Sequence, residues 1–232
     1  MFIDMNYILL VLPAIIFSMW ASKKVNSTFQ QYQTQFSSRN ITGAQAARAV
    51  LDRNGLRHIR IEQVAGNLTD HFDPTNNVIR LSEGVYNNTS TAAIGVACHE
   101  AGHAIQHATN YTPIRIRSAI VPITNLGSKL AGPLILVGLL LGAFIRFFTV
   151  FAYIGIICFA LCTFFQLITL PTEFDASKRA LQSIEGQGML VGNELEGAKK
   201  VLTAAAMTYV AALAVSLMQL IYYISAVNRR RR

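Results

Sequence analysis

The residues best suited to chemistry lie in the run HEAGH, from His99 to His103. On an α-helix, residues four apart lie one turn above each other on the same face, so both imidazoles would point to the same place. Glu100 projects about 100° away from His99, where its carboxylate can reach a water molecule bound to a metal ion. This HExxH pattern predicts that the two histidines bind Zn²⁺ and that Glu100 takes a proton from the water.

Small and apolar residues surround the motif, which indicates that its helix is buried. Burying several ionisable side chains on one side of a helix is costly unless they are paired or bind a ligand. Gly102 inside the motif costs up to about 1 kcal/mol relative to Ala, and close approach of another backbone or a ligand would explain it. The alternative is a structural pair of histidines without a metal.

His107 continues the series of histidines but does not fit the same metal. It lies eight residues after His99, which is about 12 Å along a straight helix. Zn–N bonds of about 2.0–2.1 Å cannot be made by both residues to one ion. We therefore expect His107 to be a supporting or surface group, and the third ligand to come from another segment.

The segment LPTEFDASKRAL, residues 170–181, offers that ligand. We predict Glu173 as the third ligand, with Asp175 as the alternative. Acidic residues at a helix start also complement the helix dipole, which is the alternative explanation for both. Two predicted membrane crossings separate His103 from Glu173, so both emerge on the same side of the membrane.

The elements that must position these residues are largely apolar. Hydrophobic residues make up 52% of the 232-residue chain and charged residues only 14%, where about a quarter is usual for soluble domains. Predominantly apolar segments predict four crossings of a lipid bilayer, at 2–21, 130–145, 147–170 and 201–224. A turn near Arg146 keeps its charge at the membrane surface, which avoids a cost of at least about 2.5 kcal/mol.

The polar segments between the crossings predict a small water-facing domain. Thr42 is a plausible cap for a helix that ends at Asn54-Gly55, strands are expected within 56–64 and 78–86, and the zinc helix begins near Thr91. The fold class is therefore an α+β membrane protein, mainly α-helical, with about four transmembrane helices. The chain divides into a transmembrane anchor at 1–21, an amphipathic helix at 22–40, a catalytic domain at 41–118, a transmembrane hairpin at 119–170, a third-ligand helix and connection at 171–200, and a transmembrane helix with a basic tail at 201–232.

The stretches LTDHFDPTNNVIRLSEGVY, AIGVACHEAGHAIQHA and LPTEFDASKRAL resemble the YugP-like family of bacterial membrane neutral zinc metallopeptidases. The resemblance covers nearly the whole chain and implies a membrane-embedded zinc endopeptidase with a small gluzincin-like domain. There is a looser similarity to HtpX-like and CAAX-prenyl membrane proteases, in which HExxH is followed by ExxxD. Glu173 matches the zinc-binding Glu, but Ser177 stands where the Asp supports a ligand His; Asp175 is the alternative for that role.

Two further predictions concern substrate binding and catalysis. In gluzincin-like folds the strand before the zinc helix is an exposed sheet edge, and an extended peptide can add to such an edge through main-chain hydrogen bonds. This predicts substrate binding along the run Val78, Ile79, Arg80 and Leu81; the alternative is an ordinary hairpin strand. In TDHFDP, residues 69–74, His71 is a candidate to stabilise a tetrahedral intermediate or to orient a ligand, and an ordinary turn is the alternative.

The function predicted from these features is hydrolysis of peptide bonds in membrane or membrane-proximal proteins. The alternative is a non-catalytic membrane adaptor or scaffold with a structural zinc. The net charge is +8, but no basic run interleaved with aromatic residues predicts nucleic-acid binding. The sequence leaves open a regulatory partner or a homo-oligomer. Basic residues at 23–24, 39–80 and 115–117 favour a catalytic face in the cytoplasm of a bacterial multi-pass membrane protein, although the terminal cluster Arg229–Arg232 argues the other way.

Overall fold

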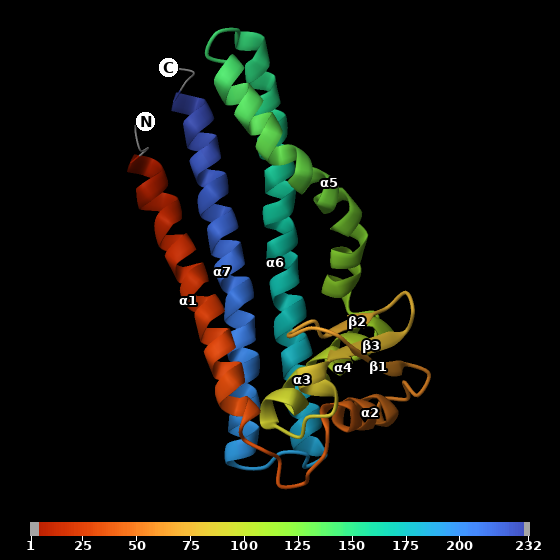
Figure 1. The fold of residues 1–232 in the computed structure, drawn as a ribbon. Helices are drawn as coiled ribbons and strands as arrows, with labels where there is room; N and C mark the ends of the chain where they lie inside the picture. Colours follow the sequence, from red (N-terminus) through yellow and green to blue (C-terminus); the bar gives the residue numbers. More distant parts are fainter. Residues whose placement is uncertain (1–4, 230–232) are drawn as a thin grey trace. The chain divides into compact units, whose positions relative to one another are not determined.

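The structure is a computed structural model that describes residues 5–229 (Figure 1). The first four residues of the predicted anchor and the last three of the basic tail lie outside the described residues. The described residues form two compact units: a helical unit of residues 5–21, 116–170 and 208–229, and an α/β unit of residues 22–115 and 171–207. The elements are α1 (Met5–Gln33), α2 (Gly43–Arg53), β1 (Arg60–Val64), β2 (His71–Asp73), β3 (Val78–Ser82), α3 (Glu83–Tyr86), α4 (Thr91–Ala108), α5 (Thr112–Leu141), the 3₁₀ helix η1 (Arg146–Phe148), α6 (Thr149–Gly186) and α7 (Asn193–Arg229).

The helical unit contains the apolar parts of α1, α5, α6 and α7. These four are the helices, within residues 5–229, that are long and apolar enough to cross a membrane, which confirms the predicted fold class. Many large apolar side chains on them are exposed, as lipid contact requires, for example Leu9, Ile16, Leu136, Leu140, Ile157, Leu167 and Ile221. The chain turns between α5 and α6 at residues 142–148, so Arg146 lies in the predicted hairpin turn.

Small residues let the helices of this unit approach closely. A Cβ built on Gly138 of α5 would collide with the backbone nitrogen of Ala152 in α6. The hydroxyls of Thr163 in α6 and Ser216 in α7 form a buried hydrogen bond of 2.7 Å. Close backbone approach and interhelical hydrogen bonds are the contacts that hold helices together in lipid.

Two helices are longer than the sequence predicts. The predicted anchor and most of the amphipathic segment form one continuous helix, α1, because no strong helix breaker separates them. Similarly, Pro171 lies inside α6 and does not begin a new helix. Both helices therefore run from one unit into the other without a break.

The α/β unit is built on a three-stranded sheet in the order β1-β3-β2. Strand β3 pairs in parallel with β1 and antiparallel with β2. The expectation that Val78–Leu81 forms an exposed sheet edge is therefore wrong: β3 is the central strand, and its five residues are mostly buried. A hairpin connects β2 to β3, and β1 pairs with the other edge of β3.

The hydrophobic core of this unit lies between the sheet and helices α2, α4 and α6. It includes Val50, Leu51, Ile79, Leu81, Val85, Ile94, Ala97, Cys98, Ala101, Ala180, Ile184 and Leu190. Thr42 caps α2 in a reciprocal capping box with Gln45, and the Ser90 side chain caps α4 by accepting from the backbone N–H of Ala93. These caps fix where the helices begin, and thus the register of the residues that α4 presents.

Candidate metal centre

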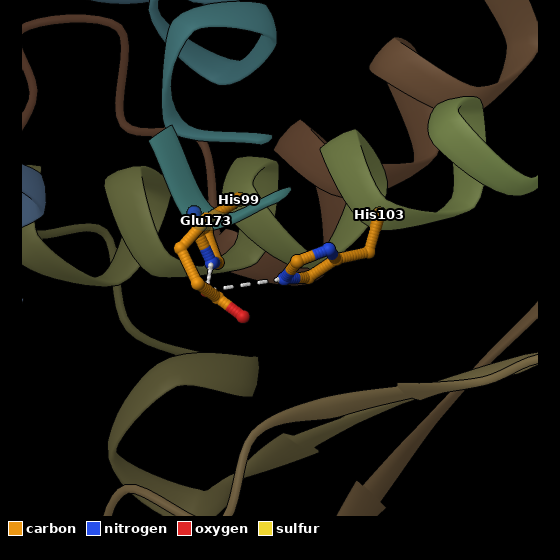
Figure 2. A group of neighbouring side chains, drawn as sticks. All are labelled: His99, His103 and Glu173. Carbon is orange, nitrogen blue, oxygen red and sulfur yellow. Dashed lines mark hydrogen bonds and ion pairs between the residues drawn. The ribbon is translucent and has the colours of Figure 1, made fainter. Parts of the chain in front are cut away.

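Helices α4 and α6 bring together three residues with metal-binding side chains, His99, His103 and Glu173 (Figure 2). Their ligand atoms all lie within 4.8 Å of one another. The Oε2 atom of Glu173 is 3.2 Å from Nε2 of His99 and 3.5 Å from Nε2 of His103. Glu173 is only 2% exposed, so its carboxylate is positioned in a nearly closed space between the two imidazoles.

This arrangement depends on a close contact between the two helices. A Cβ built on Gly102 would lie 2.6 Å from the backbone carbonyl oxygen of Ala176 in α6. Glu173 and Ala176 lie on the same side of α6, and Gly102 lies between the two histidines in the sequence. The glycine therefore allows α6 to come close enough for Glu173 to reach both imidazoles.

The three side chains fit a tetrahedral zinc ion. Zinc bonds of about 2.1 Å in tetrahedral geometry separate neighbouring ligand atoms by about 3.4 Å, and the two measured His–Glu separations are 3.2 and 3.5 Å. Two imidazole nitrogens and one carboxylate oxygen are ligands that zinc accepts, and three protein ligands leave a fourth position open. The donor set therefore suits a catalytic rather than a closed structural zinc site.

The electrostatics of the group also favour a positive charge at this point. Burial alone would lower the pKa of His103, but its hydrogen bond to Glu173 and the charges of Glu100 and Glu173 outweigh burial and raise that pKa. The pair of acidic side chains thus stabilises a cation beside His103. A metal ion supplies such a charge, and it must compete with the proton that the same residues attract.

Glu100 lies beside this group but is not one of the three residues that could hold the ion. Its Oε2 accepts a 2.9 Å hydrogen bond from the backbone N–H of Phe72 in β2. The side chain is nearly buried. An edge strand therefore holds the carboxylate of the HExxH motif, a contact that the sequence does not predict.

The Nδ1 atoms of the two histidines, which face away from Glu173, each have a side-chain partner. The Ser177 hydroxyl lies 3.1 Å from Nδ1 of His99, so Ser177 contacts a candidate ligand from the position for which the sequence resemblance implied an Asp. Gln106 lies 3.0 Å from Nδ1 of His103. Asp175, the alternative ligand, is directed elsewhere: its Oδ2 accepts hydrogen bonds from Gln106 at 2.9 Å and from Arg179 at 2.6 Å.

Sequence reasoning missed Gln106. The available signal was a polar residue three positions after His103, on the same face of a helix otherwise built from small and apolar residues. A buried amide in such a helix needs hydrogen-bond partners.

The structure does not bring His71 to this group. Its Nδ1 is 2.8 Å from the carbonyl oxygen of Thr69, and its Nε2 is 3.4 Å from Arg80. The neighbouring Phe72 packs edge-on against His107 of α4, with ring centroids 5.4 Å apart. Because successive strand residues point to opposite faces, His71 points away from α4. His107 contacts β2, in agreement with the argument that it is too far along the helix to share a metal with His99.

Comparison with known proteins shows the family to which the chain belongs. Residues 7–228 match the family described as "putative neutral zinc metallopeptidase". The chain belongs to this family, as the sequence resemblance predicted. It is also 47% identical over 220 residues to "Putative membrane protease YugP" from Bacillus subtilis (strain 168), which covers 95% of this chain and 96% of the relative. No solved structure matches the chain.

Proposed function

We propose that the protein is a membrane-embedded endopeptidase in which His99, His103 and Glu173 bind one Zn²⁺. The observation that carries this proposal is the set of His–Glu separations, 3.2 and 3.5 Å, beside a carboxylate that does not bind the metal. Membership of a zinc metallopeptidase family and the similarity to a membrane protease support the reaction class.

In the proposed mechanism the protein contributes one base and its positioning. When bound, zinc would polarise the peptide carbonyl and lower the pKa of water at the open position. Glu100 takes a proton from the attacking water and then passes it to the nitrogen of the leaving amine. The backbone N–H of Phe72, 2.9 Å from Glu100, keeps the carboxylate in place for both transfers.

We further propose that substrate binds in extended form along β2. Strand β2 pairs with β3 on one side only, and the backbone N–H of Phe72 on its other side points to Glu100. Because the Phe72 N–H is already donated to Glu100, an extended peptide at this edge would donate its own N–H groups to outward-facing carbonyl oxygens of β2, a contact largely independent of its sequence. Substrate binding is therefore proposed for the edge strand β2 and not for the central strand β3, for which the sequence predicted it.

The proposed substrates are membrane proteins or proteins at the membrane surface. The two segments that carry the candidate ligands are joined by the hairpin of α5 and α6, so the site lies directly next to membrane-crossing segments in the chain. We propose that this face is cytoplasmic, because basic residues are enriched on it. Arg57→Cys, at an exposed position, should react with a membrane-impermeant maleimide only after cells are permeabilised. Labelling of intact cells would place the catalytic face outside.

Zinc content and cleavage of an unfolded protein test the proposed function together. The purified wild-type protein should contain one zinc and cleave casein, and a chelator should abolish cleavage. Glu100→Gln should retain zinc and lose cleavage by a factor of at least about 10², whereas Glu173→Ala should lose zinc. Glu185→Gln, an exposed position on α6, is the matched control and should change neither property.

Three outcomes would contradict the proposal. Full cleavage by Glu100→Gln would exclude Glu100 as the base. Loss of zinc in Asp175→Ala but not in Glu173→Ala would reverse the ligand assignment. Zinc binding without cleavage of casein or any tested peptide would favour the alternative of an adaptor with a structural zinc.

A further inference from the structure

Gln106 connects the two helices that carry the candidate zinc ligands. It is fully buried, at 0% exposure, and lies three residues after His103 on the same face of α4. Its amide contacts three groups: Nδ1 of His103 at 3.0 Å, the carbonyl oxygen of Thr172 at 2.7 Å and Oδ2 of Asp175 at 2.9 Å. Thr172 and Asp175 flank Glu173 in the sequence of α6.

The chemistry of these partners fixes the orientation of the amide. A backbone carbonyl and an ionised carboxylate can only accept hydrogen bonds. The NH₂ group of Gln106 must therefore face Thr172 and Asp175, and it uses both of its hydrogens there. Its oxygen is left to face His103, and an amide oxygen can only accept.

The orientation of the amide in turn fixes the tautomer of His103. Because the Gln106 oxygen accepts, the Nδ1 atom of His103 must carry a proton and donate it. In a neutral imidazole the other nitrogen, Nε2, then has a free lone pair. Nε2 is the atom that faces Glu173 at 3.5 Å. A proton on Nε2 would be donated to Glu173, and a metal ion that replaces this proton would meet the lone pair of Nε2.

A further ion pair holds Asp175 in its role. Its Oδ2 accepts a 2.6 Å hydrogen bond from Nε of Arg179, one turn further along α6. The Arg179 guanidinium in turn lies over the ring of Tyr111, 5.6 Å from the centroid. These contacts direct the Asp175 carboxylate toward Gln106 and Arg179, and Asp175 is not one of the three residues that could hold the ion.

We propose that Gln106 is a positioning residue for the zinc site, which holds His103 as the Nδ1-protonated tautomer and ties it to the helix of Glu173. The inference rests on the proposed zinc site, but its first part, the tautomer, concerns the metal-free protein as well. Groups that orient a ligand His in this way commonly contribute a factor of about 10–100 to metal affinity.

The test compares two variants by zinc affinity, measured in competition with a chelator. Gln106→Met keeps the size of the side chain but has no amide, and should weaken zinc binding about 10–100-fold. Asp175→Asn is the conservative comparison, because the Asn amide oxygen can still accept from Gln106 and Arg179 and so keeps the orientation of the Gln106 amide. It should keep zinc affinity within about threefold of the wild type.

Gln187→Met is the matched control, because the Nε2 atom of Gln187 is buried without a hydrogen-bond partner among the described residues. It should leave zinc affinity unchanged. Unchanged affinity in Gln106→Met, or a folded Asp175→Asn protein that binds zinc as weakly as Gln106→Met, would overturn the proposal.

The tautomer gives a second readout that does not depend on the enzyme's activity or on zinc. In ¹⁵N NMR spectra of the metal-free protein, Nδ1 of His103 should give the shift of a protonated nitrogen, because Gln106 accepts from it whether or not Nε2 also carries a proton. Gln106→Met should shift His103 toward a mixture of tautomers. The opposite tautomer in the wild type, with a bare Nδ1, would overturn the inference even if zinc binding and cleavage behave as proposed. A wild type that binds no zinc would refute the proposed function, and these spectra would then still test the tautomer.

Discussion

The backbone N–H of Phe72, in edge strand β2, donates a 2.9 Å hydrogen bond to the carboxylate of Glu100, in helix α4, across 28 positions of sequence. The bond points away from β3, the strand with which β2 pairs. Main chain rather than a side chain thus fixes the proposed base, and substitution of most side chains at position 72 leaves the bond in place.

Phe72→Pro should therefore lower kcat while zinc content stays the same. Proline removes the N–H that holds Glu100 but no hydrogen bond of the ladder with β3. A hydrogen bond to a charged group contributes about 1.5–3 kcal/mol, which corresponds to a loss in kcat of roughly 10–100-fold. Phe72→Ala is the matched control, since it removes the ring that contacts His107 but keeps the N–H. Equal losses of kcat in the two variants would show that the ring, not the N–H, matters.

Gly102→Ala should destabilise the α/β unit and weaken zinc binding. The added methyl group would lie 2.6 Å from the carbonyl oxygen of Ala176, a backbone atom that cannot rotate away. Overpacking of this kind costs about 1–3 kcal/mol, and any movement of α6 displaces Glu173 from the histidines. The measurements are thermal unfolding in detergent and zinc affinity.

The control for that change is Gly186→Ala, at the end of α6, where an added Cβ meets nothing within 4 Å. It should leave zinc affinity unchanged and keep stability within about 1 kcal/mol of the wild type. A Gly102→Ala protein as stable as Gly186→Ala, with wild-type affinity for zinc, would show that the two helices can separate at this point without consequence.

The features that the sequence predicts well are those set by local spacing. The distance from His99 to His103 defines the facing imidazoles, Gly102 indicates a close backbone contact, and Arg146 among apolar residues indicates a turn at the membrane surface. In each case the physical reason acts within a few residues, so no knowledge of the rest of the fold is needed.

The features that could not be predicted depend on which segments meet. Strand order is set by the path of the loops, and this makes β3 central although its sequence also suits an edge. Pro171 lies inside α6, although a proline at this point of the sequence also suits the first turn of a new helix. The partners of Gln106 in α6 lie 66 and 69 positions away in the sequence. The partner of Glu100 in β2 lies 28 positions away. They become neighbours only when α6 and β2 pack against α4.

The stability contributed by Asp73 should depend on pH. Hydrogen bonds from the side chains of Asn76 and Arg80 lower the pKa of Asp73 below its ordinary value. A carboxyl group with a lowered pKa in the folded state stabilises that state above the unfolded pKa, about 3.9, and this contribution is lost as the pH falls further. The difference in unfolding temperature between the wild type and Asp73→Ala should therefore be full at pH 7 and shrink below about pH 4.

Arg80→Ala provides the comparison for this pH dependence, because it removes the ion pair of 2.8 Å with Asp73 but keeps the carboxyl group and its Asn76 contacts. Its difference from the wild type should also shrink at low pH, by a smaller amount. A difference for Asp73→Ala that grows as the pH falls would mean that the sign of the shift is wrong.

Cys98 should report on opening of the helix that carries the histidines. The thiol is fully buried next to His99, and burial raises its pKa to about 12. Because the thiolate is the reactive form, the buried thiol of the closed protein reacts poorly. In a protein with Cys158→Ala and Cys162→Ala, a maleimide should therefore label Cys98 only as fast as α4 opens. A chelator should accelerate labelling, since an ion bound by the folded site stabilises the closed state.

An exposed reference thiol, Glu185→Cys in a background that also carries Cys98→Ala, should react quickly with or without chelator. Labelling of Cys98 at the rate of this reference would show that α4 is open to solvent, and a rate indifferent to the chelator would show that no bound ion stabilises it.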